Sequence, residues 1–165
     1  MKLSISILAS LILLVGVSGE AMAACSSGGG WTQVTNLVST LTNSNAALGM
    51  TACNAAGQGT QEEHHSNGEL WDYKCGNAGS ASTGLGTPCE KPGSDIRSKL
   101  GMWSVASDNS TNATVTYQYT SFGSATTGPF KVYTDGTNYD FCDAGGASVG
   151  IFTLEPTTGT SRVCP

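Results

Sequence analysis

The sequence predicts an all-β protein: an antiparallel meander of about seven or eight strands, closed into a small barrel, with one short N-terminal helix. One observation is the segment 113–122, in which Val and Tyr side chains alternate with Thr and Gln. Such period-two alternation is typical of a strand with one buried face. A second observation is that the pairs Asn67-Gly68 and Asp135-Gly136 separate short strand-like runs, as hairpin turns do. Because adjacent runs follow tight turns, a barrel is favoured over a sandwich.

The N-terminal part of the mature chain is expected to hold the helix, because apolar residues recur there at helical spacing. The Asn43-Ser44-Asn45 segment is expected to end it. A Gly- and Pro-rich stretch, 76–98, is expected to be a long loop. The apolar residues of the helix are Trp31, Val34, Leu37, Val38 and Leu41, and the predicted strands are 46–53, 61–65, 69–74, 99–106, 113–122, 130–133, 139–142 and 149–154.

Residues 1–23 are predicted to be a cleavable signal peptide. Lys2 gives a positive start, the run 3–17 is apolar, and Ala21-Met22-Ala23 matches a small-residue cleavage site. The apolar run is shorter than the roughly 20 residues that a membrane helix requires, and no second long run follows. We therefore expect no membrane span, and a single disulfide-bonded β domain over 24–165 that is secreted or periplasmic.

Cysteine content supports an oxidising destination, because an even number in an exported chain is typical of disulfides. We expect three local pairs: Cys75 with Cys89, Cys142 with Cys164, and Cys25 with Cys53. Sequence alone leaves other pairings open. A lipid anchor on Cys25 is the alternative, but it would leave an odd thiol. The six cysteines are Cys25, Cys53, Cys75, Cys89, Cys142 and Cys164.

The amino-acid composition excludes some classes of binding partner. The net charge is −5 and only 12% of residues are charged. Nucleic-acid binding requires a basic patch that neutralises phosphates, so the sequence argues against a nucleic-acid partner. Electrostatic docking on anionic lipid is disfavoured for the same reason. The sequence indicates no cofactor.

Three segments carry a resemblance to known proteins. They are Gly101-Met102-Trp103-Ser104-Val105, Val115-Thr116-Tyr117-Gln118-Tyr119 and Tyr139-Asp140-Phe141-Cys142. In these three segments, the chain resembles a group of small exported bacterial proteins of unknown function. The resemblance spans roughly residues 31 to 155 and implies a small lipocalin-like barrel. It implies no activity.

The hairpin around Asn67-Gly68 contains both histidines and several carboxylates. On a strand, Glu62 and His64 share one face, and Glu63 and His65 share the other. His64, Glu62 and Asp72 form a candidate metal site, with Glu69 as the alternative to Asp72, because imidazole and carboxylate bind divalent ions. A solvated polar hairpin is the competing interpretation. A metal-dependent enzyme centred on His64 and His65 is accordingly one functional hypothesis, although no nucleophile motif accompanies them and the chain is not expected to be an enzyme.

Aromatic side chains on the predicted strands provide the leading functional hypothesis. One alternating set fills the interior of a barrel, either as a packed core or around a ligand cavity. For a cavity, the candidate ligand-binding residues are Trp71, Trp103, Tyr117 and Tyr119. We expect a non-enzymatic protein that binds a small apolar ligand or a protein partner. The alternative is a surface or matrix protein that associates with copies of itself.

Overall fold

The computed structural model describes residues 25–43, 48–54, 61–74, 96–120, 124–159 and 163–164. The predicted signal peptide lies outside these residues, as do Cys75, Cys89 and most of the predicted loop 76–98. The last residues of that loop, 96–98, belong to a strand. Within the described ranges, no helix has the length and hydrophobicity needed to cross a bilayer.

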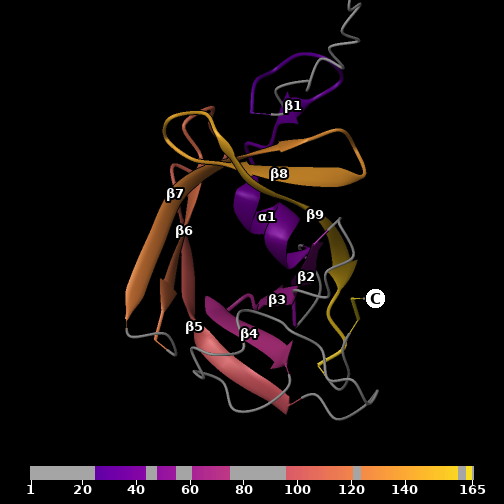
Figure 1. Ribbon diagram of the computed structural model, residues 1–165, viewed down its shortest axis with the longest axis vertical. Coiled ribbons are helices and arrows are strands. Elements are labelled where there is room, and N and C mark those ends of the chain that lie inside the picture. Colours follow the sequence, from indigo (N-terminus) through magenta and orange to yellow (C-terminus); the bar gives the residue numbers. More distant parts are fainter. Residues whose placement is uncertain are drawn as a thin grey trace, which may run out of the picture.

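An eight-stranded antiparallel meander closes into a barrel, which confirms the predicted fold class (Figure 1). Each strand pairs with the next along the chain. The ring closes where Met50–Asn54 pairs with the last strand, in a register that places Ala52 opposite Leu154. The barrel strands are β2 (Met50–Asn54), β3 (Gln61–His64), β4 (Glu69–Lys74), β5 (Ile96–Ala106), β6 (Thr114–Tyr119), β7 (Ala125–Thr134), β8 (Asn138–Cys142) and β9 (Ser148–Pro156).

Two short elements precede the barrel: β1 (Thr32–Gln33) and α1 (Leu37–Thr42). The predicted helix is therefore shorter than its apolar spacing indicated. Thr32 and Gln33 pair instead with Thr134 and Tyr133 at the end of β7, so backbone hydrogen bonds to that strand hold this segment extended. The helix ends as predicted at Asn43, which adopts a left-handed conformation and donates its N–H to the Ser39 carbonyl.

The helix packs against the interior of the barrel. Figure 1 shows α1 near the middle of the view, with β6 and β7 on one side and β2 and β9 on the other. Its residues Leu37 and Leu41 are fully buried, whereas Val38 is exposed. Helix and strands share one hydrophobic core of buried residues: Val34, Leu37, Leu41, Leu70, Leu100, Trp103, Ala113, Val115, Tyr117, Tyr119, Phe130, Val132 and Phe141.

The predicted alternation is confirmed over 113–120, while 121 and 122 lie outside the described residues. Val115, Tyr117 and Tyr119 are buried, while their neighbours on β6 are half-buried or exposed. Both predicted hairpin turns also occur: β3 and β4 flank Ser66-Asn67-Gly68, and β7 and β8 flank Asp135-Gly136. Gly68 and Gly136 have positive φ angles, the conformation for which these turns select glycine.

Two disulfides connect the chain ends of the described part to the barrel. Cys25 bonds Cys142 of β8, and Cys53 of β2 bonds Cys164. The predicted pairs Cys25–Cys53 and Cys142–Cys164 are therefore wrong, while the predicted pair Cys75–Cys89 lies outside the described residues. The prediction of pairs between cysteines close in sequence fails because closure of the barrel brings cysteines that are distant in sequence side by side. The bonds indicate an oxidising, extracytoplasmic location.

Candidate functional site

A cavity of about 170 Å³ lies within the barrel and is partly open to solvent. Interiors and mouths of β-barrels are common places for small ligands. A dry apolar cavity of about 150 Å³ is large enough to bind benzene. The lining is mainly aromatic and aliphatic, with one ionisable carboxyl group, and comprises Ala52, Glu62, Tyr117, Tyr119, Thr127, Phe130, Phe141, Val149 and Phe152.

Strand periodicity places the aromatic residues of the lining. Tyr117 and Tyr119 are two residues apart on β6, so both project to the same face, and their rings stack with centroids 6.2 Å apart. Phe141 of β8 and Phe152 of β9 meet edge to face at 5.3 Å. Val149 lines the cavity and is 51% exposed, so it borders the opening.

Glu62 is the carboxyl group of the cavity wall. It is half-buried on β3, and its Oε1 accepts a hydrogen bond from the hydroxyl of Tyr119 at 2.6 Å. Burial raises the pKa of Glu62 from 4.5 to about 7, and the hydrogen bond from Tyr119 offsets part of that rise. Near neutral pH the carboxyl group therefore exchanges between its neutral and charged forms.

His64 lies two residues further along β3 and is fully buried. Its Nε2 is 2.9 Å from the hydroxyl oxygen of Tyr117, and its ring meets the Trp103 ring edge to face at 5.5 Å. Burial lowers the pKa of His64 from 6.5 to about 4. The imidazole is consequently neutral at pH 7.

Glu63 and His65 project to the opposite face of β3, as strand alternation predicts. The Oε2 of Glu63 lies 3.1 Å from Nε2 of His65 and accepts hydrogen bonds from Nε and Nη2 of Arg97 at 3.2 and 3.1 Å. The Arg97 guanidinium also lies over the Trp71 ring, 4.4 Å from its centroid. This cluster is separate from the cavity lining.

The four predicted ligand-binding residues thus have different surroundings. Tyr117 and Tyr119 line the cavity. Trp103 is buried in the core and donates its indole N–H to the His65 carbonyl at 3.0 Å. Trp71 stacks with Arg97 and His65 in the outer cluster. A role for any of the four in ligand binding stays a prediction.

The predicted metal ligands share the inner side of the hairpin. Glu62 lines the cavity, and His64 and Asp72 are fully buried. Among the described residues, however, these three do not bring three ligand atoms within 4.8 Å of one another. Metal binding by Glu62, His64 and Asp72 therefore stays a prediction, without a compact ligand set to support it.

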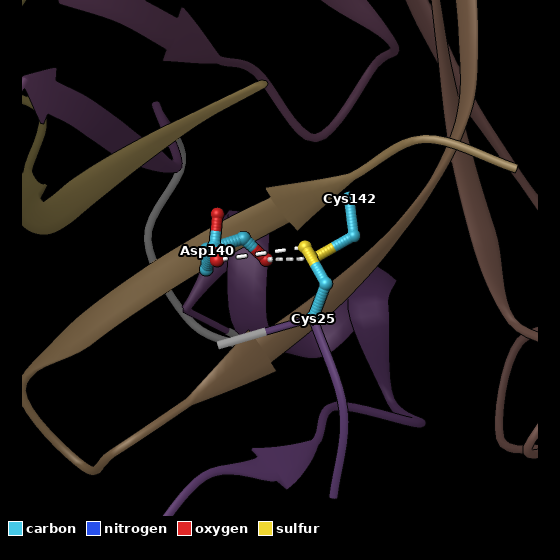
Figure 2. Close-up of side chains that lie close together, drawn as sticks. All are labelled: Cys25, Asp140 and Cys142. Carbon is cyan, nitrogen blue, oxygen red and sulfur yellow. Dashed lines mark hydrogen bonds between the residues drawn. A yellow bond between two sulfur atoms is a disulfide. The ribbon is translucent and has the colours of Figure 1, made fainter. Parts of the chain in front are cut away.

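A set that meets this distance criterion consists of Cys25, Asp140 and Cys142 (Figure 2). Cys25 Sγ lies 3.6 Å from Asp140 Oδ2, and Cys142 Sγ lies 3.7 Å from the Asp140 carbonyl oxygen. These are close contacts, not hydrogen bonds, because disulfide sulfurs carry no hydrogen. Metals bind thiolates, so the oxidised pair offers no ligand. Burial raises the pKa of Asp140, whose Oδ1 accepts a hydrogen bond from Ser148 at 2.5 Å.

Sequence reasoning missed most of the cavity wall. Phe130, Phe141, Val149 and Phe152 all lie on predicted strands, but none of them is among the predicted ligand-binding residues. Glu62 was assigned only to a metal site. The period-two pattern shows which residues of one strand share a face. It does not show which strands face each other across the barrel, and that arrangement forms the cavity.

Comparison with protein-family models, curated proteins and solved structures found no significant match. The predicted resemblance to small exported proteins is therefore supported only at the level of the eight-stranded barrel, and no family is identified.

Proposed function

We propose that this protein is a secreted or periplasmic binding protein that holds a small, largely apolar ligand inside its barrel. The partly open, aromatic-lined cavity carries this proposal. Binding pockets are typically apolar, with a few polar groups that orient the ligand. Glu62 and the hydroxyl of Tyr119 provide such groups. The disulfides support a barrel that persists outside the cytoplasm.

A cavity-filling variant tests the proposal. Ala52 lines the cavity, so Ala52→Ile would occupy part of its volume. Exposed Ala147 lies outside the lining, and Ala147→Ile is the matched control. We expect saturable binding of toluene to the wild type and to Ala147→Ile, measured by chemical-shift titration, and its loss in folded Ala52→Ile.

Two results would overturn the proposal. One is the absence of saturable binding to the wild type across a panel of single-ring and short-chain apolar compounds. The other is binding that persists unchanged in folded Ala52→Ile, because the ligand would then occupy another place.

A further inference from the structure

Aromatic rings dominate the cavity wall. Five of its nine lining residues are aromatic, and the rings of Tyr117 and Phe130 lie with centroids 6.2 Å apart. An aromatic ring has a negative electrostatic face, so rings gathered around a small space attract a cation. The rings of the wall belong to Tyr117, Tyr119, Phe130, Phe141 and Phe152.

Among the residues that the structure describes, the ionisable side chains near the cavity add negative but not positive charge. Glu62 lines the wall, and the charge of Asp72 acts on the same Tyr119 hydroxyl as that of Glu62. His64 is neutral at pH 7, because its pKa is lowered to about 4. A carboxylate that is largely shielded from water and has no nearby counter-charge is unfavourable.

No described Lys or Arg lines the cavity. Arg97 pairs with Glu63 on the opposite face of β3, and Lys99 pairs with Glu69 at 2.6 Å. Among the described residues, no positive charge therefore neutralises Glu62 in its ionised form, and a bound cationic ligand would do so.

The volume of the cavity limits the size of a ligand that could bind there. A volume of about 170 Å³ accommodates roughly one ring, since benzene fits a cavity of about 150 Å³. We propose that the cavity binds a small organic ammonium ion, with its hydrocarbon part among the aromatic rings and its ammonium group beside Glu62. This inference rests on the proposed function, because it assigns a ligand class to the same cavity.

Binding of such a cation depends on pH. An ammonium ion favours ionised Glu62, whose pKa in the empty protein is about 7. Affinity therefore rises as pH increases from 6 to 8, and binding below neutral pH releases a proton. The other ionisable groups described near Glu62 are Tyr117, Tyr119, Asp72 and His64. Of these, the two tyrosines have raised pKa values and His64 a lowered one, so these three stay neutral across this range.

The experiment compares benzylamine with benzyl alcohol, which have similar shapes and differ in charge. We expect the wild type at pH 8 to bind benzylamine at least about tenfold more tightly, by isothermal titration calorimetry. Glu62→Gln keeps the side-chain length but removes the charge, so it should abolish this preference. Glu155→Gln alters an exposed residue of β9 outside the lining and should keep it.

The outcomes separate the two proposals. If the wild type binds benzyl alcohol as tightly as benzylamine, or if folded Glu62→Gln keeps the preference, the ammonium assignment is wrong and the apolar cavity stands. If neither compound nor toluene binds, both proposals fail. A wild-type benzylamine affinity that does not change between pH 6 and 8 would contradict the ammonium assignment without any variant.

Discussion

Glu62 and His64 project from the same face of β3, and burial shifts their pKa values in opposite directions. The folded-state pKa of Glu62 is above its unfolded value of 4.5, so Glu62 destabilises the fold as pH rises from about 4.5 to 7. The folded-state pKa of His64 is below its unfolded value of 6.5, so His64 destabilises the fold as pH falls from about 6.5 to 4. In the wild type the two effects largely cancel.

Single substitutions should reveal the pH-dependent contribution of each residue to stability. Relative to wild type, Glu62→Gln should gain up to about 3 kcal/mol of unfolding free energy between pH 4.5 and 7, because glutamine does not ionise. His64→Gln should instead gain up to about 3 kcal/mol relative to wild type between pH 6.5 and 4. Urea denaturation across this pH range measures both. Differences from wild type that stay constant with pH would show that neither group titrates as described.

Arg97 neutralises Glu63, whose side chain is only 1% exposed. Arg97→Met keeps an unbranched apolar stem but removes the guanidinium that lies over Trp71, so Glu63 loses its cationic partner. We expect a loss of about 2 kcal/mol in unfolding free energy, measured by urea denaturation.

The matched control lies on the same strand. Lys99 pairs with Glu69 at a more exposed position, where solvent screens the interaction. Lys99→Met should therefore change stability much less than Arg97→Met. Equal losses of unfolding free energy in the two variants would mean that the burial of Glu63 does not increase the contribution of its ion pair to stability.

At the scale of the element, β5 and β4 pair with an irregularity. Leu70 is opposite Gly101, but Trp71 is opposite Lys99, so Leu100 is the extra residue of a bulge. Next to it, Gly101 lies close to β6: a Cβ there would be 1.9 Å from the Gln118 carbonyl oxygen. Glycine allows this close approach of the two backbones.

Gly101→Ala should consequently force β5 and β6 apart. We expect a loss of more than about 2 kcal/mol in unfolding free energy, because the obstacle is backbone that cannot rotate away. Gly145→Ala is the control, since a Cβ there meets only the side chain of Asp143, at 3.3 Å. Thermal and urea unfolding of both variants measure the difference. A Gly101→Ala variant as stable as Gly145→Ala would contradict this close approach.

At the scale of the whole molecule, both disulfides in the described part of the chain close long loops. Cys25–Cys142 spans 117 residues of sequence and Cys53–Cys164 spans 111. In the chain-entropy description, a loop of this length restricts the unfolded state by about 4–5 kcal/mol. The bonds also anchor the segments before β1 and after β9 to strands of the barrel.

Removing one bond should therefore lower stability strongly. We expect the double variant Cys25→Ser/Cys142→Ser to lose about 4 kcal/mol in unfolding free energy. Cys53→Ser/Cys164→Ser should lose a similar amount, since its loop is nearly as long. Urea denaturation of the oxidised proteins measures both. Peptide mapping of the wild type without reduction should recover these two linkages, and recovery of Cys25–Cys53 would refute the pairing.

The sequence by itself determined the local features of this protein. The alternation of Val115, Tyr117 and Tyr119 and the turns at Gly68 and Gly136 are set by neighbouring residues, so they could be predicted and are confirmed. The separation of Glu62 and His64 from Glu63 and His65 follows from the same strand geometry. Cysteine number likewise indicated disulfides.

Only the tertiary structure decided what closure of the barrel brings together. It placed Phe152 beside Phe141 in the cavity wall, Cys25 beside Cys142, and Trp71 among the outer residues rather than in the lining. It also set the opposite pKa shifts of Glu62 and His64, because burial depends on what covers each group. A short-range pattern shows which face a side chain takes. Its partner across the barrel depends on the packing of all eight strands together.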